Sequence, residues 1–238
     1  MSTGTHEHSV KHTHPVDATA ASNGQMPPRV KVCRLGEVDY LPTWEAMKQL
    51  TAARTDSDAD ELWLLQHPPV YTLGLAARAA HLPRSATRIP VVKTDRGGQI
   101  TFHGPGQIVV YTLVDLRRLG IGVRQLVRRL ENSVIELVGQ YGISASRREK
   151  APGVYVGDAK IAALGLRICN GCSYHGLSLN VDMDLAPFAE IDPCGYPGLR
   201  VSQLRDLGVR DDIDTLGEKL LVSLRKNLWN SDPDVETR

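Results

Sequence analysis

Apolar residues recur along the chain with two periods, which predict its helices and strands. Residues 122–139 show the clearest helical period, with Arg124, Arg128 and Glu131 predicted to lie away from the apolar face. The same period predicts helices over residues 39–54 and 214–229. The apolar face of the helix predicted over residues 122–139 consists of Val123, Leu126, Val127, Leu130, Val134, Leu137 and Val138.

Segments of strand length, rich in Val, Ile, Thr and Tyr, separate these helices. The predicted strands lie in residues 29–35, 61–66, 153–156, 160–169 and 173–181, and residues 89–114 should form two or three strands joined by Gly- and Pro-containing turns. No regular strand–helix–strand alternation is present. The predicted fold class is therefore α+β, with a mixed, largely antiparallel sheet flanked by helices.

The first residues differ in composition from the rest. Residues 1–28 are rich in Ser, Thr, Ala, His, Asn and Pro with little apolar periodicity, which predicts a disordered tail. Residues 29–230 are then expected to form a single domain and residues 231–238 a flexible C-terminus. The tail histidines, at positions 6, 8, 12 and 14, lack a second ligand cluster, so adventitious metal binding is the favoured interpretation.

Composition excludes several classes of protein. A net charge of +1 lacks the basic excess that nucleic-acid binding favours. Apolar runs such as Ile108 to Val114 are much shorter than the roughly 20 residues of a membrane helix. The 4 cysteines are too few for a disulfide scaffold and the start has no apolar signal segment, so free thiols and a cytoplasmic location are expected.

Cys194 lies in the most informative segment, Ile-Asp-Pro-Cys-Gly-Tyr-Pro-Gly over residues 191–198. A cysteine between Pro and Gly is expected on a sharp loop, where its sulfur can be exposed and adjacent N–H groups can face an oxyanion. This is a suitable setting for a nucleophile. The alternative is a buried structural cysteine, the usual state of a free thiol.

Lys160 enters a predicted strand of small and apolar residues. If its ammonium lies beside Cys194 it favours the thiolate, because lowering a thiol pKa from about 8.5 to neutrality requires roughly 2 kcal/mol of differential stabilisation. A close, poorly solvated cation can supply this. The alternative is an edge lysine that discourages aggregation between strands.

Residues 95–107, Asp-Arg-Gly-Gly-Gln-Ile-Thr-Phe-His-Gly-Pro-Gly-Gln, place glycine pairs on both sides of a short strand. Such glycines let a backbone approach a ligand closely, and Arg96 and His103 add a charge and a titratable ring, so the segment reads as a pocket wall. The pattern fits neither a P-loop nor a dinucleotide fingerprint. His103 could equally be a satisfied core histidine.

Two further motifs are weaker. His175-Gly176 lies on an apolar strand and is uninformative alone. Cys169 and Cys172 have a redox or half-zinc spacing, but they flank a predicted hairpin turn and have no partner pair elsewhere, so no metal site is predicted.

Four ordered blocks, residues 96–107, 160–165, 175–177 and 193–195, together resemble the lipoyl(octanoyl) transferase family. The resemblance extends over roughly Val30 to Leu228. It implies a fold shared with biotin protein ligases and lipoate ligases, with residues 29–230 as an acyltransferase domain. The implied reaction transfers an octanoyl group from octanoyl-acyl carrier protein, through a cysteine thioester, to a lysine of a lipoyl domain.

The resemblance also implies roles for individual residues. Cys194 would be the nucleophile, and Lys160 would lower its pKa and relay protons; His175 is a candidate for a supporting role. Ser178 stands where an alanine is common in the family. No cofactor and no metal are implied. The implied substrate contacts are Arg96, Gly97, Gly98, Gln99, Ile100, Thr101, Phe102, His103, Ala163, Leu164, Gly165, Gly176, Leu177 and Ser178.

The implied acceptors are the lipoyl domains of 2-oxoacid dehydrogenase complexes and the glycine cleavage H protein, and a monomer is expected. An octanoyl tail requires a largely apolar tunnel, and either Lys160 or His103 could take the acceptor lysine's proton. Arginines at positions 117, 118, 124, 128 and 129 would either dock the acidic carrier protein or form a solvated helix face. The rival functions are an ATP-dependent lipoate or octanoate ligase and a non-catalytic carrier-domain binder.

Overall fold

The computed structural model describes residues 1, 30–78, 82–85, 87–192 and 198–229. Residues 2–28 of the predicted tail, the predicted flexible residues 231–238 and Cys194 lie outside these ranges. Among the helices of the described part, none is long and apolar enough to cross a membrane.

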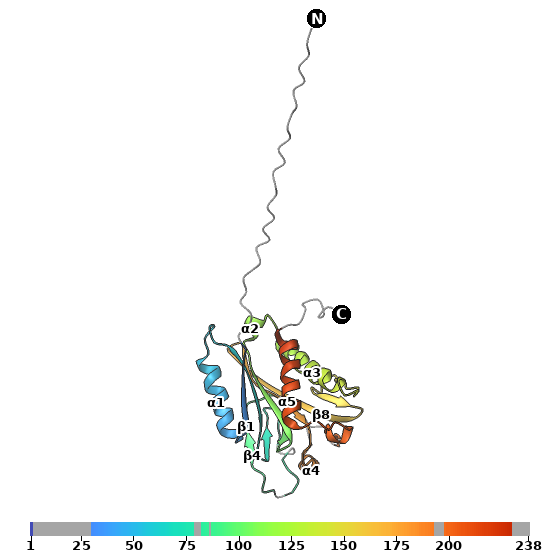
Figure 1. Ribbon diagram of the computed structural model, residues 1–238. Helices are drawn as coiled ribbons and strands as arrows, with labels where there is room; N and C mark the ends of the chain where they lie inside the picture. Colours follow the sequence, from blue (N-terminus) through green and yellow to red (C-terminus); the bar gives the residue numbers. More distant parts are fainter. Residues whose placement is uncertain (2–29, 79–81, 86, 193–197, 230–238) are drawn as a thin grey trace.

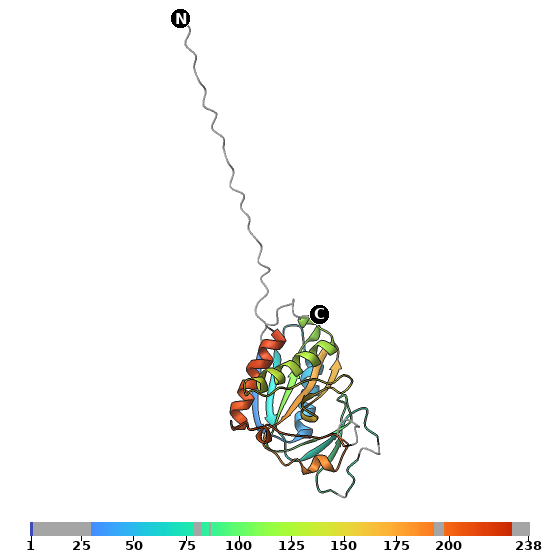
Figure 2. The same cartoon turned by 90° about the vertical axis from the view of Figure 1, so that its right-hand side faces the viewer.

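A six-stranded sheet forms the centre of the molecule, with strand order β1-β2-β6-β9-β8-β7 (Figures 1 and 2). Only β1 and β2 pair in parallel; all other neighbours are antiparallel. The fold class predicted from the sequence is therefore confirmed. The strands are β1 (Val30–Glu37), β2 (Asp60–Gln66), β6 (Gln107–Leu113), β7 (Val154–Val156), β8 (Ala159–Cys169) and β9 (Cys172–Asn180).

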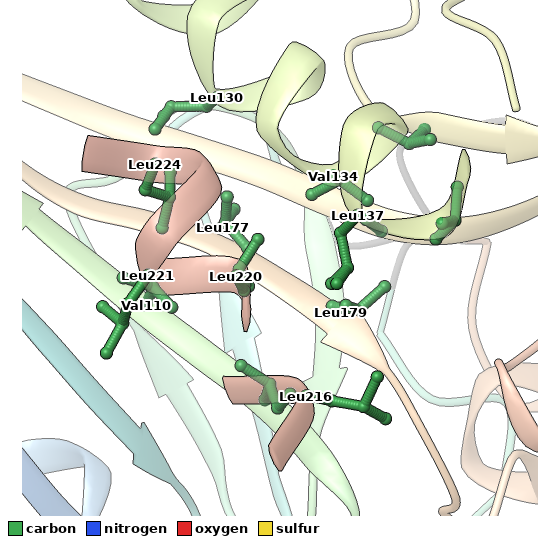
Figure 3. Packing of buried hydrophobic residues seen from close by; sticks show 14 of the residues in the cluster. Val110, Leu130, Val134, Leu137, Leu177, Leu179, Leu216, Leu220, Leu221 and Leu224 are labelled. Carbon is green, nitrogen blue, oxygen red and sulfur yellow. The ribbon is translucent and has the colours of Figure 1, made fainter. Parts of the chain in front are cut away.

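Helices cover both faces of this sheet. Helix α1 (Tyr40–Ala53) lies on one face, and α3 (Val123–Gly139) and α5 (Ile213–Trp229) lie on the other (Figure 1). Leucines and valines of α3 and α5 interdigitate over the inner strands, where Leu177 of β9 lies by Leu220 of α5 and Leu179 lies by Leu137 of α3 (Figure 3). Burying each such side chain contributes about 1.5–3 kcal/mol. The predicted α3 face supplies part of this core from Leu126 onward, but Val123, at the start of the helix, is 45% exposed and was wrongly included.

Glu131 is a correction to the predicted α3 face. It was expected to point away from the core, yet it is 4% exposed. Its Oε1 accepts a 2.9 Å hydrogen bond from the backbone nitrogen of Gly153. The polar partner that makes this burial tolerable comes from a distant loop, which helical periodicity does not reveal.

A second sheet of three strands, in the order β4-β3-β5, lies at one end of the main sheet (Figure 1). It consists of β3 (Val70–Leu73), β4 (Val91–Lys93) and β5 (Ile100–His103). The predicted 89–114 segment thus contains three strands, while β3 was not predicted. Short helices α2 (Leu116–Leu119) and α4 (Ala186–Ala189) and a 3-10 turn (Arg205–Leu207) complete the described elements.

The Cys169–Cys172 spacing belongs to the β8–β9 hairpin. Cys169 pairs with Cys172 across a two-residue turn whose Asn170 and Gly171 have φ values of 50° and 77°. Both values are those of a type I′ turn, for which Asn-Gly is a preferred sequence. The turn therefore accounts for this motif.

Candidate active site

A narrow cavity lies between strands β6, β8 and β9 of the main sheet and strand β5 of the small sheet. Most residues that the sequence assigned to substrate contact are brought together in its wall, together with His175, the candidate for a supporting role. The contact residues are Arg96, Gly98, Gln99, Ile100, Thr101, His103, Ala163, Leu164, Gly165, Gly176, Leu177 and Ser178.

Two of the assigned contact residues do not line the cavity. Gly97 donates its backbone N–H to the Leu166 carbonyl oxygen at 2.8 Å, which ties the loop to β8. Phe102 packs into a separate apolar cluster, with ring centroids 5.5 Å from Tyr71 and 5.6 Å from Phe188. In the structure, both residues lie outside the cavity lining and pack against the segments that form it.

Two glycines allow the walls to approach one another. A β-carbon at Gly165 would lie 3.0 Å from both Arg96 Cδ and the Gly97 carbonyl oxygen. At Gly176 a β-carbon would lie 2.0 Å from the Val110 carbonyl oxygen. Any larger residue at either position would push the walls apart, so these glycines are required by close backbone approach.

Arg96 joins β3 to the glycine-rich loop. It is buried, and its guanidinium donates to the carbonyl oxygens of Thr72 and Gln99 at 2.6 and 2.8 Å. A further bond of 2.8 Å reaches Thr72 Oγ1. These bonds hold the loop in place, so Arg96 shapes the wall of the cavity.

Lys160 is buried near the cavity but does not line it. Its Nζ donates to the Pro152 carbonyl oxygen at 3.0 Å and lies 5.2 Å from the centre of the Tyr155 ring. Its backbone nitrogen donates to the Arg200 carbonyl oxygen at 2.8 Å, and Ser202 donates back to the Lys160 carbonyl oxygen at 3.0 Å. An edge lysine that discourages aggregation would be solvated, so this burial argues against that alternative.

His103 and His67 lie side by side beneath the cavity, with ring centroids 5.9 Å apart. Burial lowers the pKa of His103 to about 3 and that of His67 to about 4. His103 Nδ1 bonds to Gln107 Oε1 at 2.7 Å. Both rings are therefore neutral at pH 7, and His103 is poorly suited to take a proton from a lysine ammonium.

Asp95 is a site residue that the sequence reasoning missed. Its Oδ1 accepts hydrogen bonds of 2.9 Å from Trp44 Nε1 and from His175 Nε2, and its Oδ2 accepts one from the Tyr174 hydroxyl. Burial opposes its ionisation, but the bonds from His175, Tyr174 and Trp44 prevail and hold the pKa of Asp95 well below its usual value. Its position directly before Arg96-Gly97-Gly98 was the available signal.

Tyr40, Val109 and Tyr111 also line the cavity without having been predicted. All three were placed in predicted helices or strands as ordinary apolar positions. Tyr40 stacks at 6.0 Å on His103, and Tyr111 bonds His67 through its hydroxyl at 2.6 Å. Only the packing of α1 and the small sheet against the main sheet turns these residues into a wall.

The predicted basic cluster is partly neutralised. Arg117 pairs with Asp115 at 2.8 Å and Arg118 pairs with buried Asp60 at 2.6 Å. Helix α2, which carries both arginines, lies at the end of the main sheet opposite β4 and the small sheet (Figure 1). These two arginines thus have structural roles, while Arg124 and Arg128 are exposed on α3.

Fold and site together define an α+β domain that can enclose a narrow ligand beside a buried lysine. Solved structures share this architecture. A lipoate-protein ligase A bound with ATP has a TM-score of 0.67 at 15% identity, covering 85% of this chain and 86% of that one. Biotin protein ligase from Aquifex aeolicus, with biotin and ATP, has a TM-score of 0.55 at 17% identity, covering 83% and 70%. These likenesses confirm the predicted fold.

Sequence relatives define the family. The profile of the lipoyl protein ligase A/B catalytic domain matches residues 39–225. The octanoyltransferase of Azoarcus sp. (strain BH72) is 60% identical over 197 residues, 83% of this chain and 87% of its own length. That of Dechloromonas aromatica (strain RCB) is 60% identical over 203 residues, 85% and 98% of the two chains. The chain belongs to the lipoyl protein ligase A/B catalytic-domain family, and the resemblance to its octanoyl-transferring members is confirmed.

Proposed function

We propose that this chain transfers an octanoyl group from octanoyl-acyl carrier protein, through a thioester on Cys194, to a lysine of a lipoyl domain. Octanoyl transfer is supported by relatives with that activity at 60% identity over nearly their whole length. The observation that carries the covalent route is that Lys160 is buried and that its backbone is bonded to Arg200 and Ser202, in the chain segment that follows Cys194.

Chain connectivity supports a Cys194–Lys160 pair. Cys194 precedes Arg200 by six residues, and the Arg200 carbonyl oxygen is bonded to the Lys160 backbone nitrogen. Six residues span at most about 20 Å when fully extended, and the prolines and glycines of this segment favour turns. A buried ammonium within reach of the thiol would stabilise the thiolate.

The first half-reaction forms the acyl-enzyme. The Cys194 thiolate attacks the carbonyl carbon of the donor thioester, the bond between that carbon and the carrier sulfur breaks, and the carrier thiolate takes up a proton. One thioester replaces another, so the step is nearly isoenergetic and needs no ATP. The carrier can then leave before the acceptor arrives, which predicts ping-pong kinetics.

The second half-reaction forms the amide. The acceptor lysine, with an unperturbed pKa of about 10.4, must lose a proton before its nitrogen attacks the thioester carbon. The carbon–sulfur bond then breaks and the Cys194 thiolate is restored. Of the two bases considered from the sequence, Lys160 is favoured, because burial lowers the pKa of His103 to about 3.

The cavity suits the acyl tail. Ala163, Ile100 and Val109 line it with apolar residues, and two glycines keep the walls free of side chains. Burial of an octanoyl tail at about 0.8 kcal/mol per methylene offers on the order of 5 kcal/mol of recognition. All of these residues come from one chain, so a monomer would suffice.

The test is incubation with octanoyl-carrier protein in the absence of ATP, followed by intact-protein mass spectrometry. One octanoyl group should be added to the wild-type chain and none to Cys194→Ser, and Lys160→Ala should acylate more slowly. An adduct or product that requires octanoate and ATP would favour a ligase instead. No transfer under either condition would favour a non-catalytic carrier-domain binder.

A further inference from the structure

The cavity has two chemically different ends. Strand β8 forms one wall from Ala163 to Gly165, beginning three residues beyond Lys160. At roughly 3.4 Å of rise per residue, Gly165 lies on the order of 17 Å along the strand from Lys160. Gly165 pairs with Gly176 and the next residue pairs with His175. His175 therefore stands at the end of the cavity away from Lys160.

This length matches a medium acyl chain. An extended eight-carbon chain is about as long as three strand residues, roughly 10 Å. With its carbonyl carbon near the tip of the Lys160 side chain, the chain would pass Ala163 and Ser178, which pair across β8 and β9. The tip of Lys160 lies level with Ala162, because the β-carbon position of Gly153 is 2.8 Å from Lys160 Cε and 2.7 Å from the Ala162 carbonyl oxygen. A chain of about 10 Å that starts there ends level with Gly165 and Gly176, next to His175.

His175 is held rigidly at this end. Its side chain is 1% exposed, and its ring centroid lies 5.0 Å from that of Tyr174, 6.1 Å from Tyr111 and 6.4 Å from Trp44. Its φ of 59° lies in the left-handed region, which is unusual for a non-glycine residue within a strand. Surrounding rings and an uncommon backbone conformation together fix the imidazole against the cavity.

The two ring nitrogens of His175 differ. Nε2 lies 2.9 Å from Asp95 Oδ1, and a carboxylate with three donors around it can only accept, so Nε2 carries the proton. Nδ1 is then a bare acceptor. It is buried and has no hydrogen-bond partner among the described residues. A buried acceptor without a donor is destabilising, so this end of the cavity favours a ligand that brings one.

We propose that His175 closes the acyl channel, so that chains longer than eight carbons are disfavoured, and that its Nδ1 accepts a hydrogen bond from a donor on the terminal carbon of the chain. The substrate class then includes ω-hydroxylated eight-carbon acyl groups beside octanoyl. This inference rests on the proposed acyl transfer and names the residue that selects the chain.

The first test uses the wild-type protein with octanoyl-, decanoyl- and 8-hydroxyoctanoyl-carrier proteins, following acyl-enzyme formation by mass spectrometry. Decanoyl should react at least about tenfold more slowly than octanoyl, because its tail must displace a packed polar network. The 8-hydroxyoctanoyl group should react within about fivefold of octanoyl. If this end of the cavity were purely apolar, the hydroxyl would be buried without a partner, and acylation by the 8-hydroxyoctanoyl group would be about 100-fold slower than by octanoyl.

The second test uses His175→Gly, because glycine readily adopts the positive φ at this position. The decanoyl-to-octanoyl rate ratio should rise at least about tenfold. Without the Nδ1 acceptor, the 8-hydroxyoctanoyl group should no longer react faster than acyl groups that carry other polar groups at the end of the chain. Ser178→Ala is the matched control: it alters the middle of the channel and should leave the chain-length ratio unchanged, whatever its effect on rate.

Equal decanoyl and octanoyl rates in the wild type, or an unchanged ratio in His175→Gly, would overturn the chain-length role. A loss of about 100-fold for 8-hydroxyoctanoyl would overturn the hydrogen-bond role. Absence of any acyl adduct on the wild type is a different result: it would refute the proposed function and this inference with it. The wild-type rates with the three acyl groups test the proposal even if His175→Gly does not fold.

Discussion

Gly153 lies against Lys160 so closely that a β-carbon at Gly153 would come within 2.8 Å of Lys160 Cε and 3.1 Å of Nζ. The neighbouring Pro152 carbonyl oxygen accepts the bond from Lys160 Nζ, and Glu131 holds the Gly153 nitrogen from the other side. The position of the lysine thus depends on a glycine seven residues before it and on a buried glutamate of α3.

Gly153→Ala should therefore displace Lys160. We expect slower acylation and a Cys194 thiol that ionises at higher pH, measured as the rate of alkylation against pH. Gly157→Ala is the control for an uncrowded glycine of positive φ, 53° against 143° at Gly153, with nothing within 4 Å of its β-carbon position. Lys160→Ala is the second comparison, because Gly153→Ala also meets the Ala162 carbonyl oxygen at 2.7 Å. An identical alkylation profile in wild type and Gly153→Ala would contradict the assigned role of Lys160.

Asp60→Ala should strongly destabilise the fold. The buried carboxylate accepts bonds of 2.6 Å from both Arg54 and Arg118 and one of 3.2 Å from Trp229 Nε1. Its loss leaves the buried Arg54 guanidinium without this carboxylate, a change that usually costs about 3–5 kcal/mol. Urea unfolding measures the loss. Glu218→Ala, which breaks the exposed pair with Arg34, should cost at most about 1 kcal/mol.

His67 should make stability depend on pH. Its Nδ1 donates to the Val38 carbonyl oxygen and its Nε2 accepts from the Tyr111 hydroxyl, each at 2.6 Å. Burial lowers the pKa of His67 from 6.5 to about 4, so the unfolded chain binds more protons between these values. Stability should fall as the pH drops through this window, by about 3 kcal/mol from this residue, and level off below it.

The measurement is the free energy of unfolding between pH 7 and 4. His67→Gln should reduce the decline without abolishing it, because His103, whose pKa burial lowers to about 3, also contributes a loss of stability over this window. Tyr111→Phe removes only the hydroxyl partner and keeps the titrating ring, so it should retain most of the slope. Equal slopes in wild type and His67→Gln would show that other groups cause the decline.

Gly176→Ala should separate β6 from β9, because its β-carbon would lie 2.0 Å from the Val110 carbonyl oxygen. Relief requires a backbone shift at the cavity wall, so we expect a lower melting temperature and loss of acylation. Gly139→Ala, at the end of α3 with nothing within 4 Å, should be neutral or slightly stabilising. A Gly176→Ala protein with wild-type melting temperature would refute the required close approach.

Much of the fold could be predicted because periodicity reports which positions must be apolar. The α3 face from Leu126 to Val138 and the β8–β9 hairpin with its Asn-Gly turn are examples. Strand β3 escaped prediction, since the four residues Val-Tyr-Thr-Leu after two prolines are too few to show a period of their own. Its strand form depends on pairing with β4 and β5.

Some residues of the cavity wall could likewise be predicted from the sequence, and others could not. Gln99, Ala163 and Ser178, which belong to or adjoin the motif blocks, line the cavity, because glycine-rich loops and short strands carry a recognisable pattern. They did not reveal Asp95 or Tyr40, and they could not tell that Phe102 points into another cluster.

The sequence by itself determined the helices, most strands and the residue types that meet at the site. Only the tertiary structure decided that Glu131 is buried, that Gly153 admits Lys160 and that His175 lines the cavity with a buried Nδ1 that has no hydrogen-bond partner among the described residues. The spacing of apolar residues along a helix or strand shows which face of that helix or strand a residue occupies. Whether a polar group there can be buried depends on donors and acceptors supplied by other segments, and these come together only when the chain folds.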